Sequence, residues 1–187
     1  MKLEISDIEC IDAYDKFKNL KIAADAIGIK WQTLYVRLKK NGVAVTGDKA
    51  KYGSLSDKIG AKGEKYFLSI VPFAVDQNET MFQAPVDFDV KGALVDVKAS
   101  VKKSSSKRTK AMRWSFSISR QVSKCDFFVF IAYGVSGEDV EKVFLIPSEL
   151  ASNVQTISIS CTGASKWDSY SIDPMDLSGF FMAMAGT

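Results

Sequence analysis

Residues 85 to 98 read PVDFDVKGALVDVK, and this stretch predicts two antiparallel strands joined by a tight turn. Apolar and polar residues alternate on both sides of Lys91-Gly92, where a glycine permits the two-residue turn of a hairpin. A turn of that length sets Asp87 opposite Asp96. Because side chains two residues apart share one face of a strand, Asp87, Asp96 and Lys98 are expected to converge.

Two carboxylates held side by side repel each other, so a strand pair of this kind favours a bound cation. Mg²⁺ is the natural ion, with Mn²⁺ as an alternative, because it accepts one or two carboxylates and keeps several waters. Lys98 would orient or deprotonate a water and stabilise developing charge. Asp89 lies on the same face, nearer the turn, and is the alternative to Asp87 as the first ligand. The register favours Asp87.

The composition excludes several classes of chemistry. The 187 residues include no histidine, which removes Ser-His-Asp and Cys-His hydrolysis and every metal site that needs imidazole. Cys10, Cys125 and Cys161 are far apart and lack the paired spacing of a zinc site or a disulfide framework. Cys125 is expected to be buried. Any hydrolytic chemistry must therefore rest on carboxylates, lysine and a bound metal.

The chain shows no targeting or membrane segment by pattern. No apolar run approaches the roughly 20 residues of a membrane span. The N-terminal residues lack the charged-then-apolar order of a secretory signal. We expect a soluble, cytoplasmic protein with no membrane partner.

Charge is placed unevenly, although the net charge is only +3. Between Val97 and Cys125 the charged residues are all basic, as a surface that follows a phosphate backbone requires. The alternative is a solvated, disordered loop. The candidates for DNA contact in this block are Lys102, Lys103, Lys107, Arg108 and Lys110.

The first 46 residues have the pattern of a small helical module. A short helix is predicted to end at Gly28, and a second helix spans about residues 31 to 40 and ends at Asn41-Gly42. The pattern is that of a helix-turn-helix, with a plain helical hairpin as the alternative. The buried face of the first helix is predicted to contain Ile22, Ala23, Ala26 and Ile27. The outward residues available to bases and phosphates are Gln32, Thr33, Tyr35, Arg37 and Lys39.

Residues 47 to 56 are interpreted as a linker, and residues 57 to 187 as a second domain. Ser56 or Asp57 would cap a helix that runs to about residue 70. A further helix is expected to open at Pro147. Apolar, β-branched runs predict strands at 86–90, 93–97, 113–118, 127–133, 143–146 and 156–160. One helix followed by several strands indicates an α/β or α+β fold around a mixed sheet. The run from Phe127 is apolar without alternation, as in a central strand covered on both faces.

The pattern Pro-x-Asp followed by Asp-x-Lys, on a hairpin preceded by a helix, resembles the PD-(D/E)XK nuclease superfamily. Asp87, Asp96, Lys98 and Ser100 match position by position, and the resemblance covers about residues 57 to 170. It implies a restriction-endonuclease-like mixed sheet flanked by helices, with Asp87 and Asp96 as metal ligands and Lys98 as the catalytic lysine. The departure from the strict pattern is the residue between proline and the first aspartate.

Members of the superfamily often place a glutamate on the helix before the hairpin. Glu64 fits that position as a further catalytic and metal-binding residue, and a solvent-exposed helix glutamate is the alternative.

The resemblance implies a Mg²⁺-dependent endonuclease that cleaves double-stranded DNA in the manner of a restriction or homing enzyme. Since a duplex has two strands and the chain one site, a homodimer is expected. A competing hypothesis is a non-catalytic DNA-binding regulator in which a degenerate nuclease-like domain only dimerises. A third is a nuclease acting on RNA or branched DNA; the helix-turn-helix favours duplex DNA.

Overall fold

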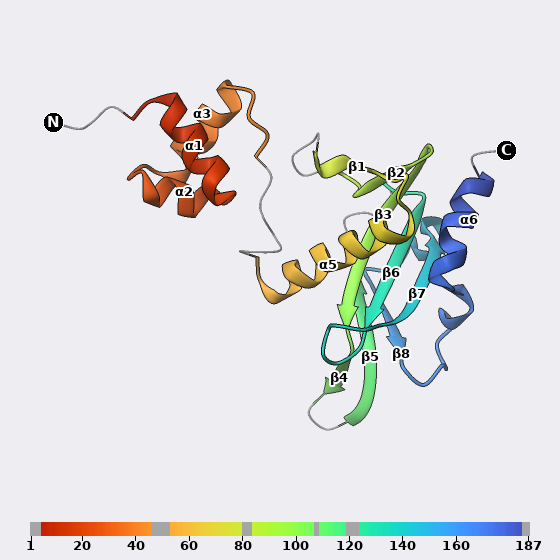
Figure 1. Ribbon diagram of the computed structural model, residues 1–187. Coiled ribbons are helices and arrows are strands. Elements are labelled where there is room, and N and C mark those ends of the chain that lie inside the picture. Colours follow the sequence, from red (N-terminus) through yellow and green to blue (C-terminus); the bar gives the residue numbers. More distant parts are fainter. Residues whose placement is uncertain (1–4, 46–52, 80–83, 107–108, 119–123, 185–187) are drawn as a thin grey trace.

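The structure is a computed structural model that describes residues 5–45, 53–79, 84–106, 109–118 and 124–184. Its first elements are three helices, α1 (Asp7–Phe17), α2 (Leu20–Ala26) and α3 (Trp31–Lys40) (Figure 1). They enclose a hydrophobic cluster made only of residues between 5 and 45, with Leu34 and Leu38 fully buried. The predicted bounds of α3 and its two inward leucines are confirmed.

The turn between α2 and α3 forms as its sequence predicts, but the buried face of α2 differs. Gly28 takes a φ of 69°, the left-handed conformation expected there. Ala23 and Ala24 are fully buried, whereas Ile22 and Ala26 face solvent. The prediction of a buried Ile22 and Ala26 was wrong, because both α1 and α3 pack against this short helix and centre its contact on the two small alanines.

Helix α5 (Leu55–Ile70) begins earlier than predicted. Its N-cap is Ser54, whose hydroxyl accepts a hydrogen bond from the Asp57 N–H while the Asp57 carboxylate accepts from the Ser54 N–H. Neither Ser56 nor Asp57 is the cap. The reciprocal pair satisfies two orphan amides at once, which is why the helix starts at Leu55.

A mixed six-stranded sheet has the order β1-β2-β3-β6-β7-β9. Its strands are β1 (Val75–Asp76), β2 (Phe88–Val90), β3 (Ala93–Val101), β6 (Phe127–Tyr133), β7 (Val140–Pro147) and β9 (Ser171–Ile172). Only the β3–β6 pair is parallel. Strand β6 is buried on both faces over almost its whole length, so the predicted central strand and mixed sheet are confirmed.

The two faces of this sheet are covered differently. On one face α5 and α6 (Pro174–Met184) pack through Phe67, Leu177 and Phe181. On the other lies a second sheet of order β4-β5-β8, whose strands are β4 (Lys103–Ser106), β5 (Thr109–Ser117) and β8 (Thr156–Ser160). Helices therefore flank the larger sheet on one face only, because the alternating residues of β5 and β8 form an apolar face that covers the other.

Short 3₁₀ helices complete the fold at Gln77–Glu79, Ser148–Ala151 and Asp168–Tyr170. The helix expected to open at Pro147 is thus a single 3₁₀ turn, and α6 was not predicted. Within the described ranges, no helix has the length and apolar character needed to cross a membrane.

Candidate active site

The hairpin that joins β2 and β3 has the predicted turn. Lys91 and Gly92 both have positive φ, 54° and 93°, as a two-residue turn of this type requires. Asp89 pairs with Leu94 across the hairpin, which confirms the expected register. The Asp89 carboxylate accepts a hydrogen bond of 2.8 Å from the Gly92 N–H. Asp89 thus stabilises the turn, which favours Asp87 as the functional carboxylate.

Asp87 immediately precedes β2 and is held by backbone groups. Its Oδ2 accepts a 2.9 Å hydrogen bond from the Val97 N–H, and its carbonyl accepts one from Gln77. The hydrogen bond to Val97 fixes the Asp87 carboxylate beside β3, between the positions of Asp96 and Lys98. The expected convergence of the two short segments is therefore seen in the structure.

Asp96 and Lys98 lie on the face of β3 that looks toward the second sheet. In the parallel ladder they pair with Phe128 and Phe130, which pack against Phe116 of β5 and its neighbours. Residues in register share a face, so the two charged side chains stand at the edge of an apolar layer. This placement explains why a carboxylate is buried here.

The three charged groups meet at one point. Lys98 Nζ lies 2.5 Å from Asp96 Oδ2 and 3.9 Å from Asp87 Oδ2. The exposed fraction of the side chain rises from 2% for Asp96 to 14% for Asp87 and 24% for Lys98. The cluster therefore has a buried end at Asp96 and an open end at the lysine, where a substrate can reach it.

Burial raises the pKa of Asp96 to about 7; the Lys98 ammonium opposes this shift and the Asp87 charge adds to it. Asp96 Oδ2 is paired with the Lys98 ammonium at 2.5 Å. A buried carboxylate costs free energy of desolvation even when it is ion-paired. Such a group, beside a second carboxylate and a lysine, is typical of a functional site.

Cys125 is buried beside this cluster, as the sequence predicts. Burial raises its pKa to about 12, and the nearby Asp96 charge adds to the shift. A thiol with that pKa is protonated at neutral pH, so Cys125 supplies neither a nucleophile nor a thiolate ligand.

Glu64 is the carboxylate whose expected role as a metal ligand stays a prediction. It lies half-buried on α5, which packs through Phe67 against Val95 and Val97, on the opposite face of β3. Within the part of the chain that the structure describes, no three carboxylates or thiolates are grouped so as to hold a metal. The structure brings Asp87, Asp96 and Lys98 together and leaves the expected third carboxylate on the helix side of the sheet.

Two carboxylates nevertheless suit Mg²⁺. The ion is held in proteins by one or two carboxylates, with waters and substrate phosphates completing its shell. The buried Asp96 carboxylate and the partly exposed Asp87 carboxylate are the oxygen donors that such a site needs. The residues present therefore fit the expected ion.

No protein-family model matches this sequence, and no curated protein matches it either. The fold is similar to that of the bacterial homing endonuclease I-Ssp6803I. The two structures superpose with a TM-score of 0.47 and 17% sequence identity, over 71% of this chain and 97% of the other. The likeness is one of backbone fold at low sequence identity.

Ser100 has a role that its place in the sequence motif did not reveal. Its hydroxyl accepts a 3.0 Å hydrogen bond from the Ser115 N–H, which ties β5 to β3 two residues beyond Lys98.

Gly63 is a second feature that the sequence did not reveal. A Cβ there would lie 2.7 Å from the Ala99 Cβ, so the glycine sets how closely α5 packs on β3.

The candidate DNA-reading residues of α3 differ in exposure. Gln32, Thr33 and Lys39 are exposed, as predicted, while Tyr35 is half-buried against the three-helix core. Arg37 is half-buried, and its contact with DNA stays a prediction. Its guanidinium donates to the Ile5 carbonyl and lies 3.5 Å from the Asp7 carboxylate, so it joins α3 to α1.

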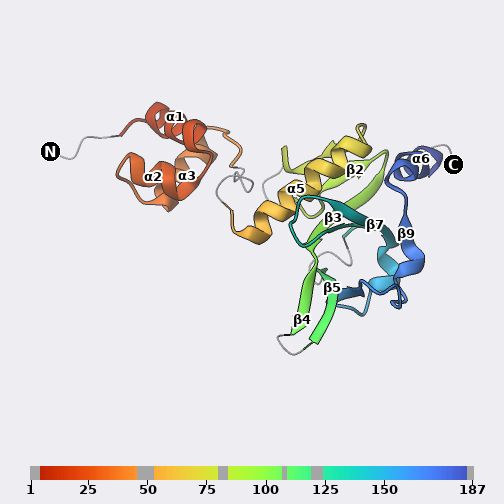
Figure 2. The same ribbon diagram turned by 60° about the horizontal axis from the view of Figure 1, so that its bottom comes forward.

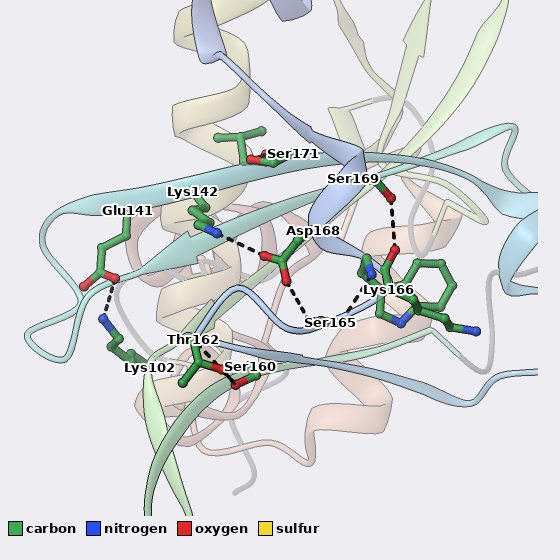
Figure 3. Close-up of polar contacts among 12 residues, drawn as sticks. Lys102, Glu141, Lys142, Ser160, Thr162, Ser165, Lys166, Asp168, Ser169 and Ser171 are labelled. Atoms are coloured by element: carbon green, nitrogen blue, oxygen red, sulfur yellow. Dashed lines mark hydrogen bonds and ion pairs between the residues drawn. The ribbon is translucent and has the colours of Figure 1, made fainter.

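The basic block forms strands β4 and β5, not a loop. The Lys102 ammonium lies 2.6 Å from the Glu141 carboxylate (Figure 3). It also lies over the Trp114 ring, and its contact with phosphate stays a prediction. Lys103 is exposed. Lys107 and Arg108 lie outside the described residues, as does the side chain of Lys110.

Proposed function

We propose that this chain is a Mg²⁺-dependent endonuclease of the PD-(D/E)XK type that hydrolyses phosphodiester bonds in double-stranded DNA. One observation carries the proposal: the carboxylates of Asp87 and Asp96 meet the Lys98 ammonium at the edge of a buried layer. Mn²⁺ is expected to replace Mg²⁺, because it takes the same oxygen ligands.

Each residue of the cluster has a distinct role in this proposal. Asp87 and Asp96 would hold the ion, and the Val97 N–H keeps Asp87 in place for it. A bound Mg²⁺ would polarise the scissile phosphate and lower the pKa of a bound water. Lys98, at the open end, would position the attacking water and stabilise the charge that develops on the phosphate.

A non-catalytic regulator is less well supported by the same geometry. A domain that only dimerises gains nothing from two carboxylates and a lysine brought together at the edge of a buried layer. The cost of burying Asp96 is understandable when a cation and a phosphate are bound there. This argument supports an enzyme over a regulator.

The three-helix unit at the N-terminus would add affinity for the duplex through α3. Gln32, Thr33 and Lys39 are exposed along this helix, where amide, hydroxyl and ammonium groups can contact bases and phosphates. Because each chain has one cluster, cleavage of both strands would require a homodimer or two successive nicks.

Incubation of the purified chain with supercoiled plasmid tests the proposal. We expect nicked and linear products with Mg²⁺ or Mn²⁺ and none with EDTA. Asp96→Asn and Lys98→Ala should each lower the rate by about a hundredfold or more, since each removes a group that acts at the reacting phosphate.

Asp89→Asn is the matched control, because it changes a carboxylate of the same hairpin that stabilises only the turn. It should cleave at close to the wild-type rate. Cleavage that survives in both Asp96→Asn and Lys98→Ala would show that the active site lies elsewhere, and loss of cleavage in Asp89→Asn alone would move the first metal ligand to that residue.

A further inference from the structure

The outer face of the three-stranded sheet is made of short hydroxyl side chains. Trp114, Phe116, Ile157 and Ile159 point inward into the core, so the alternate residues point to solvent. Across the β5–β8 ladder, Ser115 lies opposite Ser158 and Ser117 opposite Thr156. We call this surface the hydroxyl face, and it comprises Lys103, Arg113, Ser115, Ser117, Thr156 and Ser158.

One end of the hydroxyl face carries two cations set against each other. Lys103 of β4 pairs directly with Arg113 of β5, and both side chains are exposed. The Arg113 guanidinium lies across the sheet and donates to the Ser158 hydroxyl at 3.3 Å. Like charges opposite each other destabilise a sheet, and β4, β5 and β8 contain no acidic residue. An anion bound over Lys103 and Arg113 would offset the repulsion between their charges.

The hydroxyl face adjoins β3 at Ser115. Strand β5 is tied to β3 by the hydrogen bond from Ser115 to Ser100, and it runs antiparallel to β4, which follows β3 in the chain. Asp96 and Lys98 point toward the inner face of the second sheet, so the hydroxyl face lies on the other side of β5 from them. The β4–β5 ribbon continues past the end of the larger sheet (Figures 1 and 2).

We propose that the hydroxyl face is a DNA-contacting surface that adds to the affinity of the chain for a duplex. This inference rests on the proposed function and extends it to a second part of the molecule. Serine and threonine hydroxyls contact both phosphates and base edges, and their small size lets the duplex approach the strands closely. The major groove is wide enough for a two-stranded ribbon such as β4–β5.

A protein partner fits this surface less well. Protein interfaces depend on buried aromatic or aliphatic anchors, and on the hydroxyl face the described outward side chains offer hydroxyls and cations instead. The large apolar residues that are exposed lie elsewhere, for example Val135 and Met175. The surface therefore matches a polyanion with hydrogen-bonding groups.

The test is binding of a fluorescein-labelled random-sequence DNA duplex to the full chain, with EDTA present so that the duplex stays intact. Ser158→Glu places a negative charge at the centre of the hydroxyl face and should weaken binding by about tenfold or more. Ser115→Glu, on the neighbouring strand, should do the same. Met175→Glu makes the same charge change on α6, across the larger sheet, and should change the affinity by less than about twofold.

Thermal unfolding of each variant shows whether it folds. If Ser158→Glu does not fold, the binding measured for Ser115→Glu tests the proposal. Equal affinities for these variants and Met175→Glu would overturn the inference, as would tighter binding of an RNA duplex than of DNA. Plasmid cleavage by the wild type separates the two proposals. If the two Ser→Glu variants bind DNA more weakly but the wild type cleaves no plasmid, the hydroxyl face contacts DNA and the proposed nuclease activity is wrong. If the wild type cleaves plasmid but the two variants bind DNA as tightly as it does, the nuclease activity stands and the role of the hydroxyl face is wrong.

Discussion

Asp96 has a carboxylate in a place where its charge is destabilising. Its side chain is almost fully buried, and burial raises its pKa to about 7 although the Lys98 ammonium opposes the shift. In the metal-free protein at pH 8, Asp96→Asn should therefore raise the free energy of unfolding, by on the order of 1–3 kcal/mol. Urea denaturation with EDTA measures the change. Asp89→Asn is the control, and it should not stabilise.

The same substitution should have a pH dependence of known sign. The folded state binds a proton at Asp96 more tightly than the unfolded state does, so this group favours folding at low pH. Its contribution falls as the pH rises from about 4 to about 7. The stability advantage of Asp96→Asn should thus be largest above pH 7 and shrink toward pH 5. An advantage independent of pH would contradict this account.

At the scale of the helix, α5 offers two glycines that differ in surroundings. Gly60→Ala should stabilise by about 0.5–1 kcal/mol, because a Cβ there meets nothing within 4 Å and alanine favours helix. Gly63→Ala should destabilise by about 1–3 kcal/mol, because its Cβ would lie 2.7 Å from Ala99 and overpack the contact of α5 with β3. Urea denaturation of the pair measures both. Equal effects would mean that α5 does not pack at this distance.

Two basic residues of helix α3 are expected to differ in role, one in packing and one in DNA binding. Arg37→Ala should lower the unfolding temperature of the three-helix unit, since its guanidinium joins Ile5 and Asp7 to α3. Lys39→Ala should leave that temperature unchanged and weaken DNA binding through the loss of a phosphate contact. Circular dichroism and fluorescence anisotropy measure the two effects. Weakened binding by Arg37→Ala without loss of stability would identify Arg37 as a DNA contact.

For the whole molecule, metal binding should stabilise the fold. An ion held by Asp87 and Asp96 relieves their repulsion, so saturating Mg²⁺ should raise the unfolding temperature. At a Mg²⁺ concentration a hundred times the dissociation constant, the free energy of unfolding should rise by about 2–3 kcal/mol. EDTA should abolish the rise. Asp96→Asn should lose the response, while Lys98→Ala should keep it although it does not cleave DNA. A rise that persists in Asp96→Asn would place the ion elsewhere.

Some features of the fold and site depend on local chemistry and were predictable. The Lys91-Gly92 turn sets the hairpin register by itself, and alternation then puts Asp96 and Lys98 on one face. Gly28 ended α2 because only a left-handed residue fits there. The unbroken apolar run of β6 indicated a strand covered on both sides.

Other features depended on contacts between segments far apart in the chain, which a local pattern does not contain. Glu64 was expected at the metal, but α5 covers the opposite face of β3 from Asp96. Arg37 and Lys102 look like phosphate contacts in the sequence, yet each faces a carboxylate from another segment, Asp7 and Glu141. The sequence by itself determined the hairpin, its register and the convergence of its charges, because neighbouring residues control them. Only the tertiary structure decided which face of the sheet α5 covers and which cations are already paired, because both depend on how distant elements pack.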